Sequence, residues 1–438
     1  MHPSVNPFTF GNNISDPARF IGRKYEIEQI YTRLRNSEGE SSSIVGERRM
    51  GKTSILAMLQ NPQIMRDSRL DTQYFVPIYV NLEMIDETTT PTQIWKRLLK
   101  NIRSNINDAD TLVQIDKINS NNNINTFDLN DLFDGYIKHQ KRFFFLLLDE
   151  FEKITCNPNF GDSFFSGLRS LAIHYNLALV TSSRAPLQEL THSKAIAASP
   201  FFNIFATVNL PLLNVEEAHQ LVEQAVGVTP LRFRPGEVDY IIRIAGTHPF
   251  LLQLAGFYLY QAYSQQMDQN ARKQYLDQCF YREVVSHFSY IWDHTKDTQK
   301  IGLTALAFLS KRSRGENLPR QEKLKIHEHL KDFEGTMKAL CERGLVIIQE
   351  GGYRLFSPVY GIWLVNQLKS TYEPQEYESW LQKHETKNTL ANIPKQLINE
   401  VKTEILPQVS ANYRQLLISW LSEPTTITNV ISLLRSVI

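Results

Sequence analysis

The stretch "IVGERRMGKTSIL" at residues 44–56 constrains the fold more than any other part of the sequence. It fits the pattern G-x-x-x-x-G-K-[ST] from Gly46 to Thr53, and it lies between a strand-like and a helix-like segment. Glycines let such a loop point successive backbone N–H groups at a phosphate, and the N-terminus of the following helix adds its positive dipole end. The stretch therefore predicts a phosphate-binding loop, here named the P-loop.

Strand-like and helix-like segments alternate around this loop. The apolar run at 143–148 is too short for a typical helix and predicts a central strand buried on both faces. We expect strands at 41–46, 74–85, 142–150, 177–183 and 205–213, and helices at 24–35, 53–61, 90–106 and 164–175. This alternation predicts an α/β fold, with a parallel sheet flanked by helices. The Asn-rich stretch 105–130 predicts a mobile surface loop.

The strand signals stop after Leu213. Asn214 and Glu217 have capping-box spacing, and Gly246 and Pro249 separate two apolar helices, so a helical lid should follow the core. Further on, the sequence predicts a helix at 302–311, a basic loop at 310–325 and a helix that ends at Gly344, followed by a two-stranded hairpin and a last helix. Helices followed by such a hairpin predict a winged helix. We expect an N-terminal arm (1–19), a P-loop core (20–213), a helical lid (214–290), a winged helix (291–370), a linker (371–391) and a small helical C-terminal module (392–438).

Composition limits the partners and the compartment. Lys and Arg number 47 and Asp and Glu 46, so the net charge of +1 gives no global attraction to nucleic acid or to an acidic membrane. The N-terminus lacks the basic and apolar regions of a signal peptide, and no apolar run approaches the ~20 residues that span a bilayer. The three cysteines lie far apart and suggest no disulfide framework. We expect a cytoplasmic protein that does not contact membranes.

Four residues are candidates for the chemistry of phosphate transfer. Lys52 should reach the β- and γ-phosphates, and the Thr53 hydroxyl should bind Mg²⁺. Asp149, at the end of the apolar run, is placed to hold Mg²⁺ through water. Glu150 follows it and is the candidate general base that polarises an attacking water. Together these residues predict hydrolysis as well as binding.

Two further elements complete the candidate site. Arg184 follows the strand "LALVTSS", at the sheet edge where ligands bind in parallel α/β folds, and could stabilise transition-state charge in cis. Pro249, in "AGTHPFLLQ", could press against an adenine base from the lid. Arg169, on the helix after Asp149-Glu150, is the best candidate for an arginine finger acting in trans.

From residue 6 to about residue 370 the chain resembles the archaeal-type AAA ATPases and the related STAND class of signal-transduction ATPases. The motifs that carry the resemblance are "GERRMGKTS", "FFFLLLDEFE", "LVTSSRAP", "LPLL" and "GTHPFLLQLAG", together with "NPF" and "FIGR" near the N-terminus. The resemblance implies ATP or ADP with Mg²⁺ as cofactors. It implies a nucleotide site made of Ile21, Gly22, Arg23, Gly46, Arg49, Met50, Gly51, Lys52, Thr53, Ser54 and Pro249.

Three functions fit these observations. The favoured one is a slow, regulatory ATPase that switches between ADP and ATP states, forms a homo-oligomer and recruits a protein effector through the C-terminal helices. A role in defence signalling rests on family analogy alone. The main alternative is a DNA-binding ATPase of the origin-recognition or transposition-regulator type, although the candidate recognition helix around 332–345 has balanced charge. The third is a scaffold that binds nucleotide without turnover. No internal repeat of a STAND sensor array is visible.

Overall fold

The structure is a computed structural model that describes residues 5–36, 39–296, 299–300, 302–303, 306–307, 331–349 and 352–370. These residues form two compact units. The first unit contains the chain up to Asp239 together with Thr247–Tyr275. The second contains Tyr240–Gly246 and the described residues from Leu276 onward.

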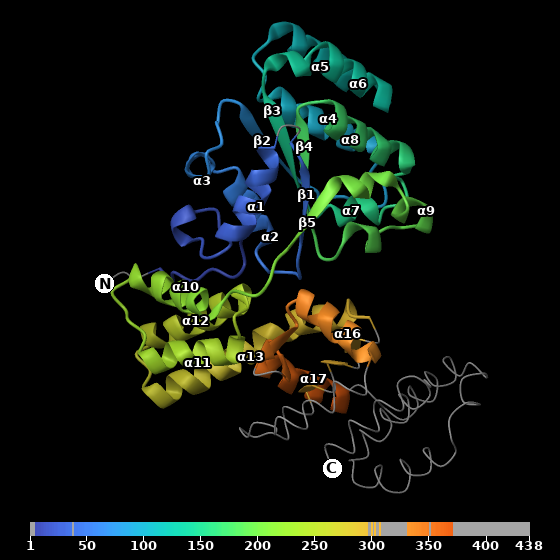
Figure 1. Cartoon of the computed structure of the whole chain (residues 1–438). Coiled ribbons are helices and arrows are strands. Elements are labelled where there is room, and N and C mark those ends of the chain that lie inside the picture. Colours follow the sequence, from blue (N-terminus) through green and yellow to red (C-terminus); the bar gives the residue numbers. More distant parts are fainter. Residues whose placement is uncertain are drawn as a thin grey trace, which may run out of the picture. The chain divides into compact units, whose positions relative to one another are not determined.

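A five-stranded parallel sheet forms the centre of the first unit, in the order β2-β3-β4-β1-β5 (Figure 1). Its strands are β1 (Ser41–Val45), β2 (Phe75–Asn81), β3 (Phe143–Asp149), β4 (Leu177–Ser183) and β5 (Phe205–Asn209). All five predicted strands are present, and the predicted α/β class is confirmed. Because the strands run in the same direction, their C-terminal ends form one edge of the sheet. The P-loop, which follows β1, and the acidic pair Asp149 and Glu150, at the end of β3, both lie at this edge.

Strand β3 is buried on both faces, which explains its uninterrupted apolar sequence. Its odd-numbered residues from Phe143 to Leu147 belong to one core cluster, with α1 (Lys24–Leu34) and α2 (Lys52–Leu59). Its even-numbered residues from Phe144 to Leu148 belong to the other, with α4 (Pro91–Arg103) and α8 (Asp162–His174). By this alternation Asp149 lies on the face covered by the P-loop helix α2.

Helices cover both faces of the sheet (Figure 1). One face carries α1 (Lys24–Leu34), α2 (Lys52–Leu59) and α3 (Pro62–Asp67). The other carries α4 (Pro91–Arg103), α5 (Ala109–Ser120), α6 (Thr126–Gly135), α7 (Glu152–Thr155), α8 (Asp162–His174) and α9 (Lys194–Ala197). Short 3₁₀ helices lie at Pro17–Arg19, Ile137–Gln140, Leu187–Glu189 and Pro200–Ile204.

The predicted mobile loop at 105–130 is wrong for most of its length, because α5 and the start of α6 occupy it. The Asp108 carboxylate caps α5 by accepting a hydrogen bond from the Thr111 amide at 2.8 Å. Asn125 and Asp128 form a capping box at the start of α6. Apolar residues at helical spacing then bury this segment against the sheet-side helices. Only residues 121–125 of the Asn-rich stretch lie between the two helices.

The first unit also contains two helices that follow the sheet, α10 (Val215–Gly227) and α12 (Pro249–Ser264). The capping box of Asn214 and Glu217 is present at the start of α10, as predicted. In the sequence, α11 (Pro235–Ala245) comes between these two helices, and the predicted break at Gly246 and Pro249 separates α11 from α12.

In the second unit a helix, an antiparallel strand pair and a helix follow in order. The elements assigned here are the end of α11, most of α13 (Gln269–Asp293), α16 (Lys331–Glu342), β6 (Val346–Gln349), β7 (Gly352–Leu355) and α17 (Pro358–Ser370). Gly246 has φ +63°, and a Cβ there would lie 1.9 Å from the Phe356 carbonyl oxygen, so only glycine fits. The hairpin and its helices are where they were expected, and their designation as a winged helix stays a prediction.

Several expectations lie outside the described residues. They concern most of the helix expected at 302–311, the basic loop 310–325, the linker 371–391 and the C-terminal module 392–438. Among the helices that are described, none combines the length and apolar character needed to cross a bilayer.

Candidate nucleotide-binding site

The P-loop connects the end of β1 to the start of α2. The Gly46 amide donates to the Ser183 carbonyl oxygen at 3.2 Å, so the loop begins against the end of β4. Gly51 has φ +93°, a conformation that favours glycine, and it directly precedes α2. The Lys52 ammonium donates to the carbonyl oxygens of Gly46 at 2.7 Å and Glu47 at 3.0 Å. These bonds hold the charge of Lys52 over the loop.

Asp149 is buried at the end of β3 and is held from the strands on either side. Its Oδ1 accepts a hydrogen bond from the Ser182 hydroxyl of β4 at 2.5 Å. Its Oδ2 accepts one from the Tyr79 hydroxyl of β2 at 3.0 Å. Each carboxylate oxygen has about two lone-pair sites, so Asp149 keeps acceptor capacity for a water or a metal-bound water.

Glu150 has a strained backbone conformation, with φ +56°. Its amide donates to the Ser182 hydroxyl at 3.0 Å, so one serine holds both members of the acidic pair. Partial burial, followed by the charges of Asp149 and Glu83, raises the pKa of Glu150. Strain of this kind persists where the surrounding contacts enforce it, and it is concentrated at functional sites.

Glu152 is a third acidic residue at this edge, and the sequence reasoning did not select it. Its Oε1 accepts a hydrogen bond from the Arg184 amide at 3.2 Å, while its Oε2 is buried without a partner among the described residues. Burial raises the pKa of Glu152. Burial lowers the pKa of Lys52, and the nearby carboxylates oppose this, Glu152 most strongly. The third acid of "DEFE" was the available signal.

Arg184 follows the last residue of β4, as predicted. Its backbone reaches the acidic cluster through Glu152. Arg184 is partly exposed, and its charge lowers the pKa of the Cys156 thiol, against the larger effect of burial. No contact in the described part of the chain joins the Arg184 guanidinium to Lys52 or Asp149, and its role stays a prediction. Arg169 lies on α8, and its role as an arginine finger in trans stays a prediction.

The "FIGR" turn joins the P-loop to the start of α10. The buried Arg23 pairs with Glu26 at 3.3 Å, and its guanidinium donates to the Met50 carbonyl oxygen at 3.5 Å. Gly22 has φ +75°, and a Cβ there would lie 2.9 Å from Oε1 of Glu217. The turn therefore contacts both the P-loop and the first turn of α10. Ile21 is partly buried beside it in the chain.

The lid helix α12 also reaches the P-loop. Pro249 occupies the first position of α12, where its missing N–H costs no helical hydrogen bond. The next residue, Phe250, has its ring 4.1 Å from Cζ of Arg49, a cation–π contact. Sequence reasoning selected Pro249 and Arg49 but missed Phe250, because nothing in the sequence pairs an aromatic ring with the P-loop.

The N-terminal arm touches both the P-loop helix and α12. The Ile14 amide donates to the Ser54 hydroxyl at 3.0 Å. The Thr9 amide donates to Oε1 of Gln253 at 3.0 Å. Thr53, the candidate magnesium residue, is partly buried in the first turn of α2. The arm, in which no site residue was predicted, therefore contacts the P-loop helix at one predicted residue, Ser54.

Comparison with known proteins identifies a family for this arrangement. The family model described as Novel STAND NTPase 2 matches residues 36–314. Among solved structures, the Walker-type ATPase PABY2304 of Pyrococcus abyssi is 14% identical, with 81% of this chain and 99% of that chain covered and a TM-score of 0.48. The Aeropyrum pernix ORC2 protein, in its ADPNP–ADP complexes, is 12% identical, with coverages of 84% and 99% and a TM-score of 0.49. No curated protein matches the sequence.

Proposed function

We propose that this chain, which belongs to the novel STAND NTPase 2 family, binds and slowly hydrolyses ATP and uses the nucleotide state as a switch. The observation that carries the proposal is the convergence of the P-loop, Asp149, Glu150 and Glu152 at one sheet edge. Ser182 of β4 bonds both Asp149 and Glu150. A P-loop NTPase needs a phosphate cradle and an acidic group beside it, and this edge supplies both.

The residues present fit a nucleoside triphosphate with Mg²⁺. Lys52 lies over a loop whose conformation requires Gly51, and its bonds to two loop carbonyls can be exchanged for phosphate oxygens. Thr53 and Asp149 offer the hard oxygen ligands that Mg²⁺ prefers. When bound, Mg²⁺ neutralises charge on the β- and γ-phosphates. Arg23, Arg49 and Pro249 would surround the remainder of the nucleotide.

Hydrolysis requires a base that takes a proton from water. Glu150 is partly buried beside Asp149, and its raised pKa brings it closer to the range in which a carboxylate is an effective general base. The Ser182 hydroxyl would orient Glu150 by accepting from the Glu150 amide, and Asp149 by donating to the Asp149 carboxylate. In this proposal Arg184 stabilises charge on the γ-phosphate in cis.

A switch requires that ATP and ADP favour different arrangements. Moving an equilibrium from 1:99 to 99:1 takes about 5.5 kcal/mol of differential binding. The contact of Arg49 with Phe250 and that of Arg23 with Met50 connect the P-loop to α12 and to the "FIGR" turn, so a nucleotide would act on all three. We infer homo-oligomerisation in the ATP state, and effector recruitment through residues 392–438.

Single-turnover phosphate release tests whether the chain is an ATPase. The parent protein should release phosphate from bound ATP, and the Glu150→Gln variant should bind ATP with similar affinity but release phosphate at least about 100-fold more slowly. Equal release by both proteins would remove Glu150 from the mechanism. Absence of release from the parent would favour a non-hydrolysing scaffold.

Size-exclusion chromatography with light scattering tests the switch. The mass should increase in a non-hydrolysable ATP analogue relative to ADP. Deletion of residues 392–438 should abolish capture of the effector. A mass that is independent of nucleotide would contradict the switch. A salt-sensitive increase in mass on adding duplex DNA would support the DNA-binding alternative instead.

A further inference from the structure

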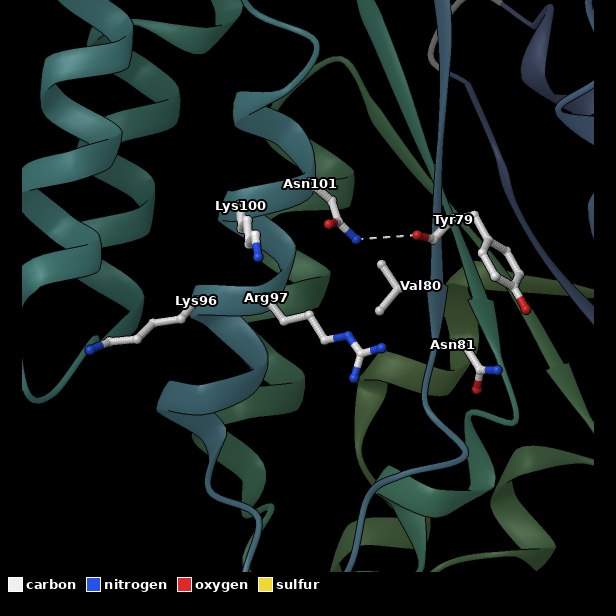
Figure 2. Close-up of a pocket in the computed structure, with 7 residues that line it drawn as sticks. All are labelled: Tyr79, Val80, Asn81, Lys96, Arg97, Lys100 and Asn101. Carbon is white, nitrogen blue, oxygen red and sulfur yellow. Dashed lines mark hydrogen bonds between the residues drawn. The ribbon is translucent and has the colours of Figure 1, made fainter.

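A groove lies beside the outer edge of β2, where no strand pairs with it among the described residues. It is a hollow of about 570 Å³ between β2 and α4. Figure 2 shows the residues that line it: Tyr79, Val80, Asn81, Lys96, Arg97, Lys100 and Asn101. We name it the β2–α4 groove. Of these residues only Tyr79 also contacts the nucleotide site, through the hydroxyl that bonds Asp149.

The backbone of β2 presents hydrogen-bonding groups to this groove. The Leu82 amide bonds the Asp149 carbonyl oxygen of β3 at 3.2 Å, so even-numbered residues bond towards the sheet. Odd-numbered residues therefore direct their N–H and C=O groups outwards. Asn101 confirms the direction, since its side-chain amide donates to the Tyr79 carbonyl oxygen at 3.2 Å (Figure 2). Pro77 is also odd-numbered, so its missing N–H limits strand pairing to the part from Tyr79 onwards.

The side chains around the groove are basic and amide groups. Lys96, Arg97 and Lys100 come from one face of α4, and no carboxylate lines the groove. Arg97 and Lys100 are exposed, Lys96 is partly exposed, and none of the three has an ion-pair partner within the described residues. The Arg97 side chain extends from α4 towards β2 (Figure 2). The groove therefore favours an anionic occupant over a cationic one.

We propose that the β2–α4 groove binds an acidic, extended protein segment, which adds to β2 as a short edge strand. The outward N–H groups of Tyr79 and Asn81 and the Asn81 C=O group match a peptide backbone, while the Tyr79 carbonyl oxygen, which already accepts from Asn101, keeps one further lone pair. The cations of α4, above all Arg97, whose side chain extends towards β2 (Figure 2), match carboxylates that project from alternate residues of such a strand. Nucleic acid would also satisfy the cations, but its backbone offers no N–H donor to pair with the edge.

The same strand connects the groove to the nucleotide site. Tyr79 contributes its backbone to the groove, while its hydroxyl donates to Oδ2 of Asp149 at 3.0 Å. A segment that pairs with the Tyr79 backbone acts on a residue that bonds the candidate magnesium ligand. Binding to the groove therefore regulates nucleotide affinity, a consequence that rests on the proposed function. Peptide binding to the groove does not depend on the proposed function.

Fluorescence anisotropy with a labelled peptide of alternating glutamate and threonine tests the binding without nucleotide. The variant Lys96→Glu/Arg97→Glu/Lys100→Glu should bind about tenfold or more weakly. The matched control is Lys117→Glu/Lys194→Glu/Lys338→Glu, which makes the same change in charge at exposed lysines elsewhere and should bind like the parent. The corresponding triple alanine variant serves as a second test if the charge reversal disturbs folding, and circular dichroism checks both.

Backbone pairing has its own test. A peptide with alternate N-methylated residues keeps its charge but loses N–H donors, and its Kd should rise about two- to tenfold. Equal weakening in the groove variant and in the control variant would overturn the proposal, because only net charge would then matter. It would also be overturned if labelled duplex DNA bound the groove residues and the peptide did not.

The regulatory consequence is measured separately. Saturating peptide should change the Kd for Mg-ATP, and by linkage ATP should change the peptide Kd by the same factor. Tyr79→Phe, which removes only the hydroxyl that bonds Asp149, should abolish this coupling. Coupling that persists in Tyr79→Phe would refute the route through Asp149. Failure of ATP binding in the parent would refute the proposed function and leave the peptide result standing.

Discussion

Replacing Ser182 with alanine removes a fully buried hydroxyl that holds both acidic residues of the site. The hydroxyl donates to Oδ1 of Asp149 at 2.5 Å and accepts from the Glu150 amide at 3.0 Å. The substitution changes little volume, so its effect should come from these two bonds. The Glu150 amide would lose its partner, and the backbone at φ +56° would lose a contact that maintains its strain.

The magnitude follows from the charge of the acceptor. A hydrogen bond to a charged group contributes about 1.5–3 kcal/mol, and about 1.4 kcal/mol corresponds to a tenfold change in rate. If Asp149 and Glu150 must be held for hydrolysis, the single-turnover rate of Ser182→Ala should fall about 10- to 150-fold. The Mg²⁺ concentration that gives half the maximal rate should also rise.

Ser183→Ala provides the matched control. Ser183 is equally buried and adjacent in the sequence, but its hydroxyl donates to the Ala185 carbonyl oxygen at 2.7 Å and not to the acidic pair. Its hydrolysis rate should remain within about twofold of the parent value, whatever its effect on stability. Equal hydrolysis by Ser182→Ala and the parent, or an equal loss in Ser183→Ala, would refute the positioning role of Ser182.

One further substitution, at Gly22, and the pH dependence of hydrolysis also test the site. Gly22→Ala should weaken ATP binding and lower Tm, because the positive φ costs about 1–2 kcal/mol and the new Cβ meets the Glu217 carboxylate. The control for calorimetry is Gly135→Ala, where a Cβ meets nothing within 4 Å. A Tm of Gly22→Ala equal to that of the parent would contradict the close approach. The hydrolysis rate at saturating Mg²⁺ should fall as pH decreases through a midpoint above the ordinary glutamate pKa, because the pKa of Glu150 is raised and only its carboxylate is a base. A rate that does not change with pH in this range would argue against Glu150 as the base.

Much of the core was predictable because its signals are local. The apolar run of β3 required burial on both faces, and both core clusters include it. The capping box at Asn214 and Glu217 depends on residues three positions apart, so the sequence was sufficient. The P-loop likewise consists of consecutive residues between a strand and a helix.

The errors and omissions involve residues whose roles depend on distant partners or on competing signals. An Asn-rich composition outweighed the apolar spacing of α5 and α6, although the caps at Asp108 and Asn125 were visible in the sequence. Tyr79 could not be placed because the register of β2 against β3, which pairs Asn81 with Asp149, is a tertiary property. Ser182 and Phe250 were quoted within motifs, but their partners lie on other elements.

Titration of Mg-ATP into the parent protein and into Lys52→Ala tests the central claim most directly. If a triphosphate lies in the P-loop beneath the Lys52 ammonium, the variant should bind ATP at least about 100-fold more weakly, a loss of about 2.7 kcal/mol. Its folding should be unchanged by circular dichroism, since the Lys52 side chain bonds only loop carbonyls. Equal affinity in the two proteins would mean that the nucleotide, if it binds, binds elsewhere.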